Sequence, residues 1–416
     1  MSWDHKHTGR RATLLRLLGL AALVAGLVGA GGPRDARAQA ERPVIDPQRV
    51  GYPRSMAALG DSITRAFLSV PINYPAELPS DGPQNSWTSG TEAAVNSHYS
   101  RILAAQPAIS GKNNNLAATG SKMEALAGQA NQAVAAQSEY VTILMGSNDV
   151  CAGSEGAMTD VTLFRTQFSA ALTALSAGLP DARILVVGVP DVYQVWQLSH
   201  TNPQAQYIWN LGVCQSMFQN PAVDDPNSAD MQRRDRVRQR NLDYNTQLSQ
   251  VCAQFIHCRY SDVLFESTLV AADMAQDYYH PSIAGQAKLA AATYTQGFNF
   301  SDMAAPISTA RSSRAGGGMY QISISASDNA GVAGIEYRLG AGPWQRYLGP
   351  LAVAEDAEVI YRAVDINGNI EGSRMALILN RHIFLPAVTR SAATDAGQSA
   401  QIVYSAIIRT IVRSLS

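Results

Sequence analysis

Apolar and polar positions divide this chain into two regions with different periods. From about residue 52 to residue 300, short apolar runs alternate with longer Ala-rich stretches. From residue 319 to residue 379, apolar and polar residues alternate nearly one by one. Short apolar runs between longer amphipathic stretches predict buried strands and helices, whereas a period of two predicts strands with one buried face. The sequence therefore predicts an α/β region followed by an all-β region.

The first region contains five strand candidates and five helix candidates. The strands are expected at Ser55–Leu59, Asn115–Ala118, Tyr140–Met145, Arg183–Val189 and Arg259–Val263. The helices are expected at Thr91–Ala105, Ser121–Gln137, Val161–Ala177, Ala229–Phe255 and from Ser282 to about Tyr294. Such alternation predicts a parallel sheet covered by helices on both faces, with ligands at the carboxyl ends of its strands.

Two longer segments, 71–90 and 190–228, interrupt the alternation. The second is rich in aromatic residues, namely Tyr193, Trp196, Tyr207, Trp209 and Phe218. Long segments over an active face often form substrate walls, and the same aromatics can instead pack the insert onto the body of the domain. A run of five arginines between Arg233 and Arg240, interleaved with Asp235 and Gln239, predicts a solvated helix face.

The second region predicts a small antiparallel sandwich, immunoglobulin-like in architecture. Its alternating runs include Tyr320–Ala326, Ile335–Leu339 and Val359–Val364, and turn signals at 328–331 and 367–369 separate them. We expect an α/β domain at 52–300 and the sandwich at 318–380. Linkers are expected at 41–51 and 301–317, with a tail at 381–416. If the sandwich tethers or targets an enzyme, we expect that removing 304–416 spares the activity of the α/β domain on soluble esters and reduces binding to a surface.

The N-terminal segment 1–40 predicts a cleaved secretory signal. A basic stretch with Arg10, Arg11 and Arg16 precedes the apolar run 17–30, and small residues follow at 36–40. A membrane anchor is the alternative, but the apolar run is short and Gly-rich for a span. The arginine pair also permits a twin-arginine route, so the export route stays open. We therefore expect a secreted protein with no stable membrane span.

Composition narrows the classes of partner and cofactor that the chain is expected to bind. Hydrophobic residues make up 46% of the chain and the formal net charge is −1, so no electrostatic footprint for nucleic acid is present. The four cysteines are Cys151, Cys214, Cys252 and Cys258. An even number in an exported chain predicts two disulfides, and pairing Cys252 with Cys258 would close a short loop. A zinc site is the alternative, but the paired C-x-x-C spacing is missing. We expect no metal and no cofactor.

Four short motifs carry the candidate chemistry. Ser62, in Gly-Asp-Ser, directly follows the apolar run 56–59, and a serine there is either a nucleophile or a helix cap. Asp277 and His280 stand three apart before a predicted helix, where they can serve as orienter and base or merely cap the helix. Gly120 and Asn148 follow two other predicted strands and can donate hydrogen bonds to an oxyanion.

In this order, Gly-Asp-Ser, a strand-end Gly, Gly-x-Asn-Asp and Asp-x-x-His-Pro, the motifs resemble the GDSL or SGNH hydrolase family over roughly residues 52–297. The resemblance implies a flavodoxin-like three-layer α/β/α SGNH fold. It assigns Ser62 as nucleophile, His280 as base and Asp277 as its orienter. Ser62, through its backbone N–H, together with Gly120 and Asn148 would form the oxyanion hole. One departure is Gly-Asp-Ser-Ile in place of Gly-Asp-Ser-Leu.

Within that family the chain is similar to the secreted phospholipase B and bacterial extracellular esterase branch, through Asn85-Ser86-Trp87, Asn115-Leu116-Ala117 and Asn148-Asp149-Val150-Cys151. We therefore expect a serine ester hydrolase that acts on a lipid or an acylated small molecule. A carbohydrate O-deacetylase is the alternative enzyme. The non-enzyme alternative is an adhesion protein on an inactive scaffold. In either case the sandwich would contact a cell surface or a glycan.

Overall fold

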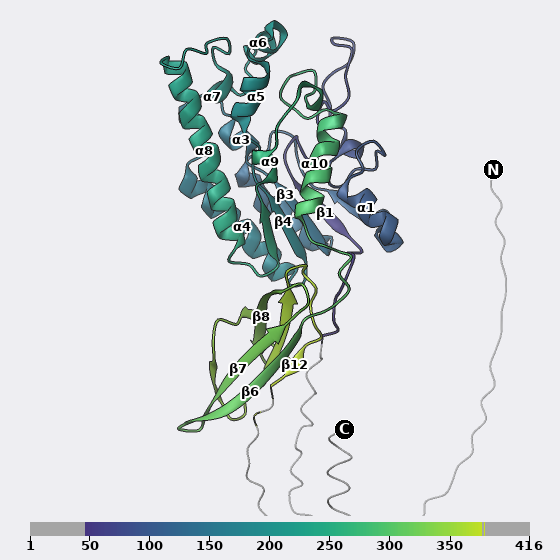
Figure 1. Ribbon diagram of the computed structural model, residues 1–416, viewed down its shortest axis with the longest axis vertical. Coiled ribbons are helices and arrows are strands. Elements are labelled where there is room, and N and C mark those ends of the chain that lie inside the picture. The colour runs from purple at the N-terminus through teal and green to yellow at the C-terminus, as the bar shows by residue number, and fades with distance from the viewer. Residues whose placement is uncertain (1–45, 377, 379–416) are drawn as a thin grey trace, which may run out of the picture. The chain divides into compact units, whose positions relative to one another are not determined.

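The computed structural model describes residues 46–376 and residue 378. The segment 1–40, for which we expected a secretory signal, and the tail 381–416 lie outside these residues. Two regular regions follow one another along the described chain, an α/β domain and a pair of antiparallel sheets (Figure 1).

A five-stranded parallel sheet forms the centre of the α/β domain. Its strands are β1 (Met56–Gly60), β2 (Asn113–Asn115), β3 (Tyr140–Leu144), β4 (Arg183–Val187) and β5 (Cys258–Ser261). They lie in the order β2-β1-β3-β4-β5, and every neighbouring pair is parallel. All residues of β1, β3 and β4 are buried. The predicted parallel sheet is therefore confirmed.

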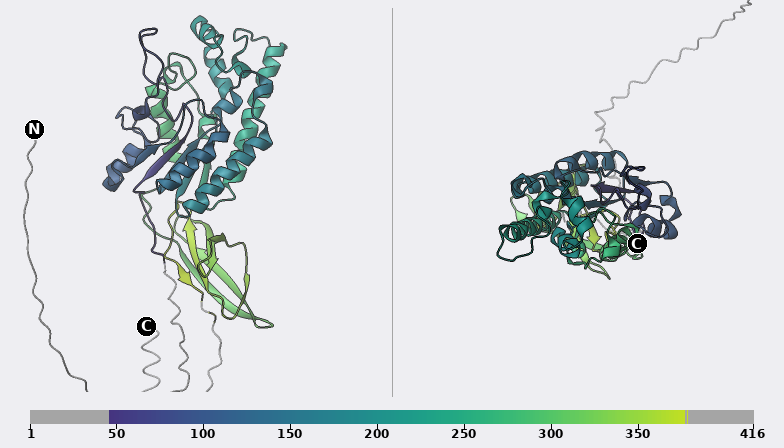
Figure 2. Two further views of the ribbon diagram at one scale, coloured as in Figure 1. Left: turned by 180° about the vertical axis from the view of Figure 1, so that it is seen from behind. Right: turned by 90° about the horizontal axis from the view of Figure 1, so that it is seen from above.

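Helices cover both faces of this sheet, as Figures 1 and 2 show. The long helices are α1 (His98–Ala105), α2 (Leu126–Ala135), α4 (Val161–Gly178), α8 (Ala229–Cys252) and α10 (Ile283–Gln296). Successive side chains of β1 enter opposite cores: Ala57 and Leu59 pack with α2, α4 and α8, whereas Met56 packs with α1 and α10. The period of two in the strands thus builds two separate cores.

The strand β2 begins earlier than the sequence predicted. We expected Asn115–Ala118, but the strand is Asn113–Asn115. It lies at the edge of the sheet and is only partly buried, so three asparagines are tolerated there. An apolar run therefore could not mark it.

The insert 190–228 is folded rather than open. It contains α5 (Val192–Ser199), α6 (Pro203–Trp209) and α7 (Gln215–Phe218). Trp196, Trp209 and Phe218 are buried in the core that includes α8, so packing is the observed role of these aromatics. Tyr207 is 66% exposed.

One arginine of the expected solvated face is buried, which corrects that expectation. Arg234 has no exposed surface and donates to the carbonyl oxygens of Met217, Gln219, Asn220 and Val223. These carbonyls follow or belong to α7, where backbone acceptors need partners. Arg234 thereby fastens the insert to α8.

Two antiparallel sheets form the second region. One has the order β10-β7-β6 and the other β12-β11-β8-β9. The strands are β6 (Ile307–Gly316), β7 (Met319–Ser327), β8 (Val332–Leu339), β9 (Gln345–Arg346), β10 (Leu351–Ala354), β11 (Val359–Asp365) and β12 (Arg374–Met375). Tyr320, Ile322, Val353 and Tyr361 are among the residues of their shared core. Strand β6 occupies the segment expected as a linker, because its largely exposed, polar residues conceal it in the sequence.

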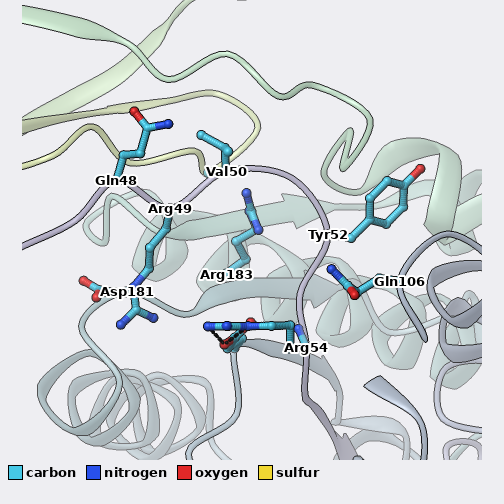
Figure 3. A pocket seen from close by; sticks show the side chains of 10 residues that line it. Gln48, Arg49, Val50, Tyr52, Arg54, Gln106, Asp181 and Arg183 are labelled. Atoms are coloured by element: carbon cyan, nitrogen blue, oxygen red, sulfur yellow. Dashed lines mark hydrogen bonds and ion pairs between the residues drawn. The ribbon is translucent and has the colours of Figure 1, made fainter. Parts of the chain in front are cut away.

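The sandwich contacts the amino end of the parallel sheet. Arg183, the first residue of β4, donates to the carbonyl oxygens of Gly51 and Asn367 and to Oδ1 of Asn369, at 2.8–2.9 Å. A cavity of about 340 Å³ lies at this junction, and Figure 3 shows Arg49, Arg54 and Arg183 among its lining residues. The segment 46–51, expected as a linker, also contacts the sandwich through the bridge between Arg49 and Ile370.

Candidate active site

Ser62 lies directly after β1 at the carboxyl end of the sheet. Gly60 ends this strand with φ of +152°, and a Cβ there would collide with the carbonyl oxygen of Leu144 on β3. Glycine is therefore required where β1 turns into the serine loop. The side chain of Ser62 is held in a nearly enclosed position, with 4% of the residue exposed.

Asp277 and His280 come from the loop that precedes α10. Tyr278 between them has φ of +56°, a left-handed conformation that brings the two side chains together. The carboxylate Oδ2 of Asp277 lies 2.6 Å from Nδ1 of His280, and Nε2 of His280 lies 2.9 Å from Oγ of Ser62. With the proton on Nδ1, the hydroxyl of Ser62 donates to Nε2, as a nucleophile donates to its base.

The environment of Asp277 keeps this residue ionised. Burial alone would raise its pKa, but the hydrogen bond and the charge of His280 outweigh burial and hold the pKa below its usual value. The backbone N–H groups of Tyr279 and His280 also donate to its Oδ1 at 3.0 Å. An ionised carboxylate at Nδ1 orients the imidazole and favours its protonated form during catalysis.

Gly120 and Asn148 lie in the loops that follow β2 and β3, the two strands that flank β1. Gly120 has φ of +81°, a conformation that favours glycine, and a Cβ built on it would meet no atom within 4 Å. Asn148 belongs to the short helix α3 (Ser147–Val150), and its Nδ2 donates to the carbonyl oxygen of Ser121 at 2.9 Å. Because an amide group carries two N–H donors, one remains for an oxyanion.

Comparison with known proteins agrees with this arrangement. The sequence model of the GDSL-like Lipase/Acylhydrolase family matches residues 58–288, more than half of the chain. The chain belongs to this family. The match covers Ser62, Gly120, Asn148, Asp277 and His280, and the sandwich lies outside it.

Several solved structures are similar to this GDSL-like hydrolase at low identity. TesA is 15% identical with a TM-score of 0.35, and the match covers 58% of this chain and 97% of TesA. A structure from Parabacteroides merdae, described as a GDSL-like lipase, is 15% identical with a TM-score of 0.38 and coverages of 60% and 98%. An active-site mutant of a family two carbohydrate esterase from Clostridium thermocellum is 14% identical with a TM-score of 0.33 and coverages of 60% and 63%. No curated protein sequence matches the chain.

Two aromatic rings flank the imidazole of His280, and sequence reasoning missed both. The ring centroids of Phe67 and Tyr279 lie 5.0 Å and 4.9 Å from that of His280. Ala66 and Leu68, on either side of Phe67, both have left-handed conformations with φ of 51° and 54°. Such conformations cost free energy in residues other than glycine. The serine loop therefore accepts strain where it presents Phe67 to His280.

Two buried glutamines hold the serine loop, and they were also missed. Gln129 on α2 bonds to both the N–H and the C=O of Gly60, at 2.8 and 2.9 Å. Gln286 on α10 donates to the carbonyl oxygen of Ile63 and accepts from the N–H of Trp87. A polar residue on the buried face of a helix was the signal available in the sequence. These residues fix the backbone around Ser62 from both sides of the sheet.

The cysteines pair in two disulfides, Cys151–Cys214 and Cys252–Cys258. One group of three carboxylates within residues 46–376 has oxygen atoms within 4.8 Å of one another, namely Asp302, Asp328 and Asp365. This group lies outside the loops that carry Ser62 and His280, and Asn367 and Asn369 donate to two of its members. In the part of the chain that the structure describes, no helix is long and apolar enough to cross a membrane.

Proposed function

We propose that this GDSL-like hydrolase is a secreted serine carboxylic-ester hydrolase. The observation that carries the proposal is the continuous hydrogen-bonded chain from Ser62 through His280 to Asp277, at 2.9 and 2.6 Å, beyond the carboxyl end of β1. Nucleophile, base and orienting carboxylate in hydrogen-bond contact are the minimum for acyl transfer through a covalent intermediate.

Each group has one task in the proposed reaction. Oγ of Ser62 attacks the acyl carbonyl while Nε2 of His280 takes its proton. The N–H groups of Ser62 and Gly120 and the amide of Asn148 stabilise the oxyanion. His280 then protonates the leaving alcohol, and a water molecule activated by the same imidazole releases the acyl group from Ser62. Asp277 remains ionised throughout.

The test is Ser62→Ala measured on p-nitrophenyl acetate, with fluorophosphonate labelling as a second readout. We expect kcat to fall by roughly 10⁴-fold or more and labelling to disappear. Ser154 is an exposed serine in a loose Gly-x-Ser-x-Gly sequence, and Ser154→Ala provides the matched control. Retention of full activity by Ser62→Ala would refute the assignment.

A small cavity next to the catalytic residues supports a short acyl group. It has a volume of about 50 Å³, and apolar residues such as Val192, Val195 and Leu269 line it. Its wall also includes Ile63 and Tyr279, the sequence neighbours of Ser62 and His280. We propose that it receives the end of the acyl chain of a lipid ester, in keeping with the likeness to phospholipase B-like esterases.

The same small volume also suits an acetyl group, so a carbohydrate O-deacetylase is the second candidate. A panel of p-nitrophenyl esters of two to twelve carbons, short-chain phospholipids and acetylated glycans separates the two. We expect esters of two to four carbons to react fastest in either case. Faster release of acetate from glycans than from all lipid esters would favour the deacetylase.

Export and the immunoglobulin-like character of the sandwich also belong to this proposal. The predicted signal at 1–40 and the two disulfides are consistent with an oxidising compartment. Expression of the full chain with fractionation of cells and medium tests export. Binding of the active protein to cell-wall material tests the proposed surface contact of the sandwich.

A further inference from the structure

Asp61 is a buried carboxyl group for which the proposed mechanism has no use. It directly precedes Ser62, and none of its surface is exposed. Its Oδ1 accepts from the N–H of Ile63 at 3.0 Å. Its Oδ2 is inaccessible to solvent and has no hydrogen-bond partner among the described residues. A buried carboxylate left half-satisfied is costly, so this position needs an explanation.

Ser147, the first residue of α3, is a second buried polar residue without a partner in the described part of the chain, and it follows the neighbouring strand β3. It directly precedes Asn148, is 3% exposed, and its hydroxyl also lacks a hydrogen-bond partner among the described residues. The strands that lead to the two residues are in register, since Gly60 of β1 pairs with Leu144 of β3. The hydroxyl of Ser147 lies close enough to interact with the carboxyl group of Asp61. The two unsatisfied groups therefore lie near each other, just beyond the carboxyl ends of two neighbouring strands.

We propose that Asp61 is a positioning residue that acts as a neutral carboxylic acid, hydrogen-bonded to Ser147, and that this bond joins the loops carrying Ser62 and Asn148. The proposal rests on the proposed ester hydrolysis, because it assigns the bond to the assembly of the oxyanion hole. A protonated carboxyl group donates one hydrogen bond and still accepts others, so it satisfies Oδ2 and the serine hydroxyl together.

The surroundings of Asp61 favour the neutral form. Burial raises the pKa of Asp61 to about 7, against the N–H of Ile63 and the charge of His280, which lower it. Asp149 on α3 raises the pKa further, and the hydroxyl of Ser147 lowers it. Tyr279, which is partly buried, also interacts with Asp61, since loss of contact with water and then the charge of Asp61 raise the pKa of that tyrosine. No lysine or arginine is among these neighbours.

A neutral Asp61 also suits the chemistry. The transition state places negative charge on the oxyanion, which the N–H group of Ser62 is expected to bind. An ionised carboxylate one residue away would repel that charge in a site with little water. Ionisation of Asp61 should therefore lower kcat on the alkaline side of the pH profile.

Asp61→Asn is the decisive variant, because asparagine reproduces the shape and the donor of a neutral carboxylic acid. We expect its kcat on p-nitrophenyl acetate at pH 6 to stay within about threefold of wild type, and the fall in kcat above about pH 7 to disappear. Asp61→Ala, which removes the bond, should lower kcat by roughly tenfold or more with little change in KM. Loss of activity in Asp61→Asn at every pH, or an unchanged alkaline fall, would overturn the proposal.

Ser147→Ala tests the other half of the bond. Removing its hydroxyl removes the proposed hydrogen-bond partner of Asp61. We therefore expect a several-fold lower kcat and a change in the pH at which kcat falls on the alkaline side. An unchanged kcat with an alkaline fall at the wild-type pH would contradict the pairing.

Thermal unfolding tests the charge of Asp61 without any substrate. An aspartate in the unfolded chain loses its proton near pH 3.9, while the folded protein keeps it up to about pH 7. The wild type should therefore lose stability relative to Asp61→Asn as pH rises from about 4 to 7, and the difference should stay constant above that. A difference that does not depend on pH would overturn the proposal. If this difference appears while the wild type hydrolyses no ester, only the proposed function fails.

Discussion

Two buried polar groups at the carboxyl end of the parallel sheet differ in their hydrogen bonding from a buried arginine at its amino end. At the carboxyl end, Oδ2 of Asp61 and the hydroxyl of Ser147 have no hydrogen-bond partner among the described residues, and residues beside Phe67 are strained. At the amino end, the guanidinium of Arg183 is 7% exposed but donates three hydrogen bonds to the segment 46–51 and the sandwich. These groups at the two ends of the sheet therefore differ in how well they are paired. The contrast is not complete, because Nδ1 of His257, which lies beside Glu336 of the sandwich, also lacks a partner among the described residues.

The buried arginines at the amino end also keep their charge. Burial lowers the pKa of Arg183 to about 10, so it remains protonated at neutral pH. Arg362 of the sandwich, 2% exposed, pairs with Glu336 and with Asp181 of the α/β domain. A buried ion pair is strongly destabilised when one partner is removed. We therefore no longer expect removal of 304–416 to spare the α/β domain.

The largest expected effect is a loss of activity from a substitution in the site at the carboxyl end of the sheet. His280→Ala should lower kcat by roughly 10⁴-fold or more, because it removes the base that activates Ser62. The melting temperature should fall only modestly, because the mostly buried imidazole loses its hydrogen bond to Asp277 while the cores of the domain stay intact. Kinetics on p-nitrophenyl acetate and a thermal melt check this. His200→Ala is the matched control, and an equal loss of activity there would contradict the assignment.

Arg183→Met should disrupt the contacts at the amino end of the sheet and leave the site at its carboxyl end intact. It leaves the carbonyl oxygens of Gly51 and Asn367 without their donor, and we expect a loss of about 3–5 kcal/mol in the free energy of unfolding, with kcat of the folded protein unchanged. Urea unfolding measures it. Arg54, in an exposed pair with Glu139 at the same end, gives the control, and Arg54→Met should cost only about 0–1 kcal/mol. Equal losses would show that the buried Arg183 contributes no more stability than the exposed Arg54.

Asn148→Ala should lower kcat by about 10²–10³-fold, the usual loss of one oxyanion donor. The bond from Asn148 to Ser121 is also lost, so Asn148→Asp, which keeps the shape without the donor, serves as the comparison. Both variants should leave KM nearly unchanged. A rise in KM with normal kcat would assign Asn148 to substrate binding instead.

The smallest effect is a dependence of stability on acid pH. The pKa of Asp277 is lower in the folded protein than in the unfolded chain, so its contribution is present above the unfolded value of about 3.9 and is lost as pH falls through the lower folded value. Asp277→Asn should therefore flatten the acid decline of the melting temperature. An identical decline in both proteins would indicate that the bond to His280 adds no stability.

The elements of the α/β domain could be predicted from the sequence where neighbouring residues alone determine the secondary structure. The strands β1, β3 and β4 are buried on both faces, so continuous apolar runs mark them. Ser62, Asp277 and His280 were also predicted, because strand-end and helix-start positions in a parallel sheet converge. The structure brings these three into contact.

Segments whose structure depends on contacts with residues far away in sequence could not be predicted. Strands β2 and β6 are edge strands with polar residues, and their pairing with β1 and β7 defines them. Arg234 looked like part of a solvated face, yet carbonyl groups from the folded insert surround it. Local patterns could not report these long-range contacts.

The sequence by itself determined the order of the elements, because apolar periodicity is a local property of the chain. It also pointed to Ser62, Asp277 and His280, through motifs that resemble those of the GDSL-like family. Only the tertiary structure decided which polar groups are satisfied. Asp61, Arg183 and Gln129 are all buried polar residues, and nothing adjacent in sequence distinguishes the one left half-satisfied from the two that are bonded. The folded chain makes that distinction, because burial and hydrogen-bond partners are set by residues far away in sequence.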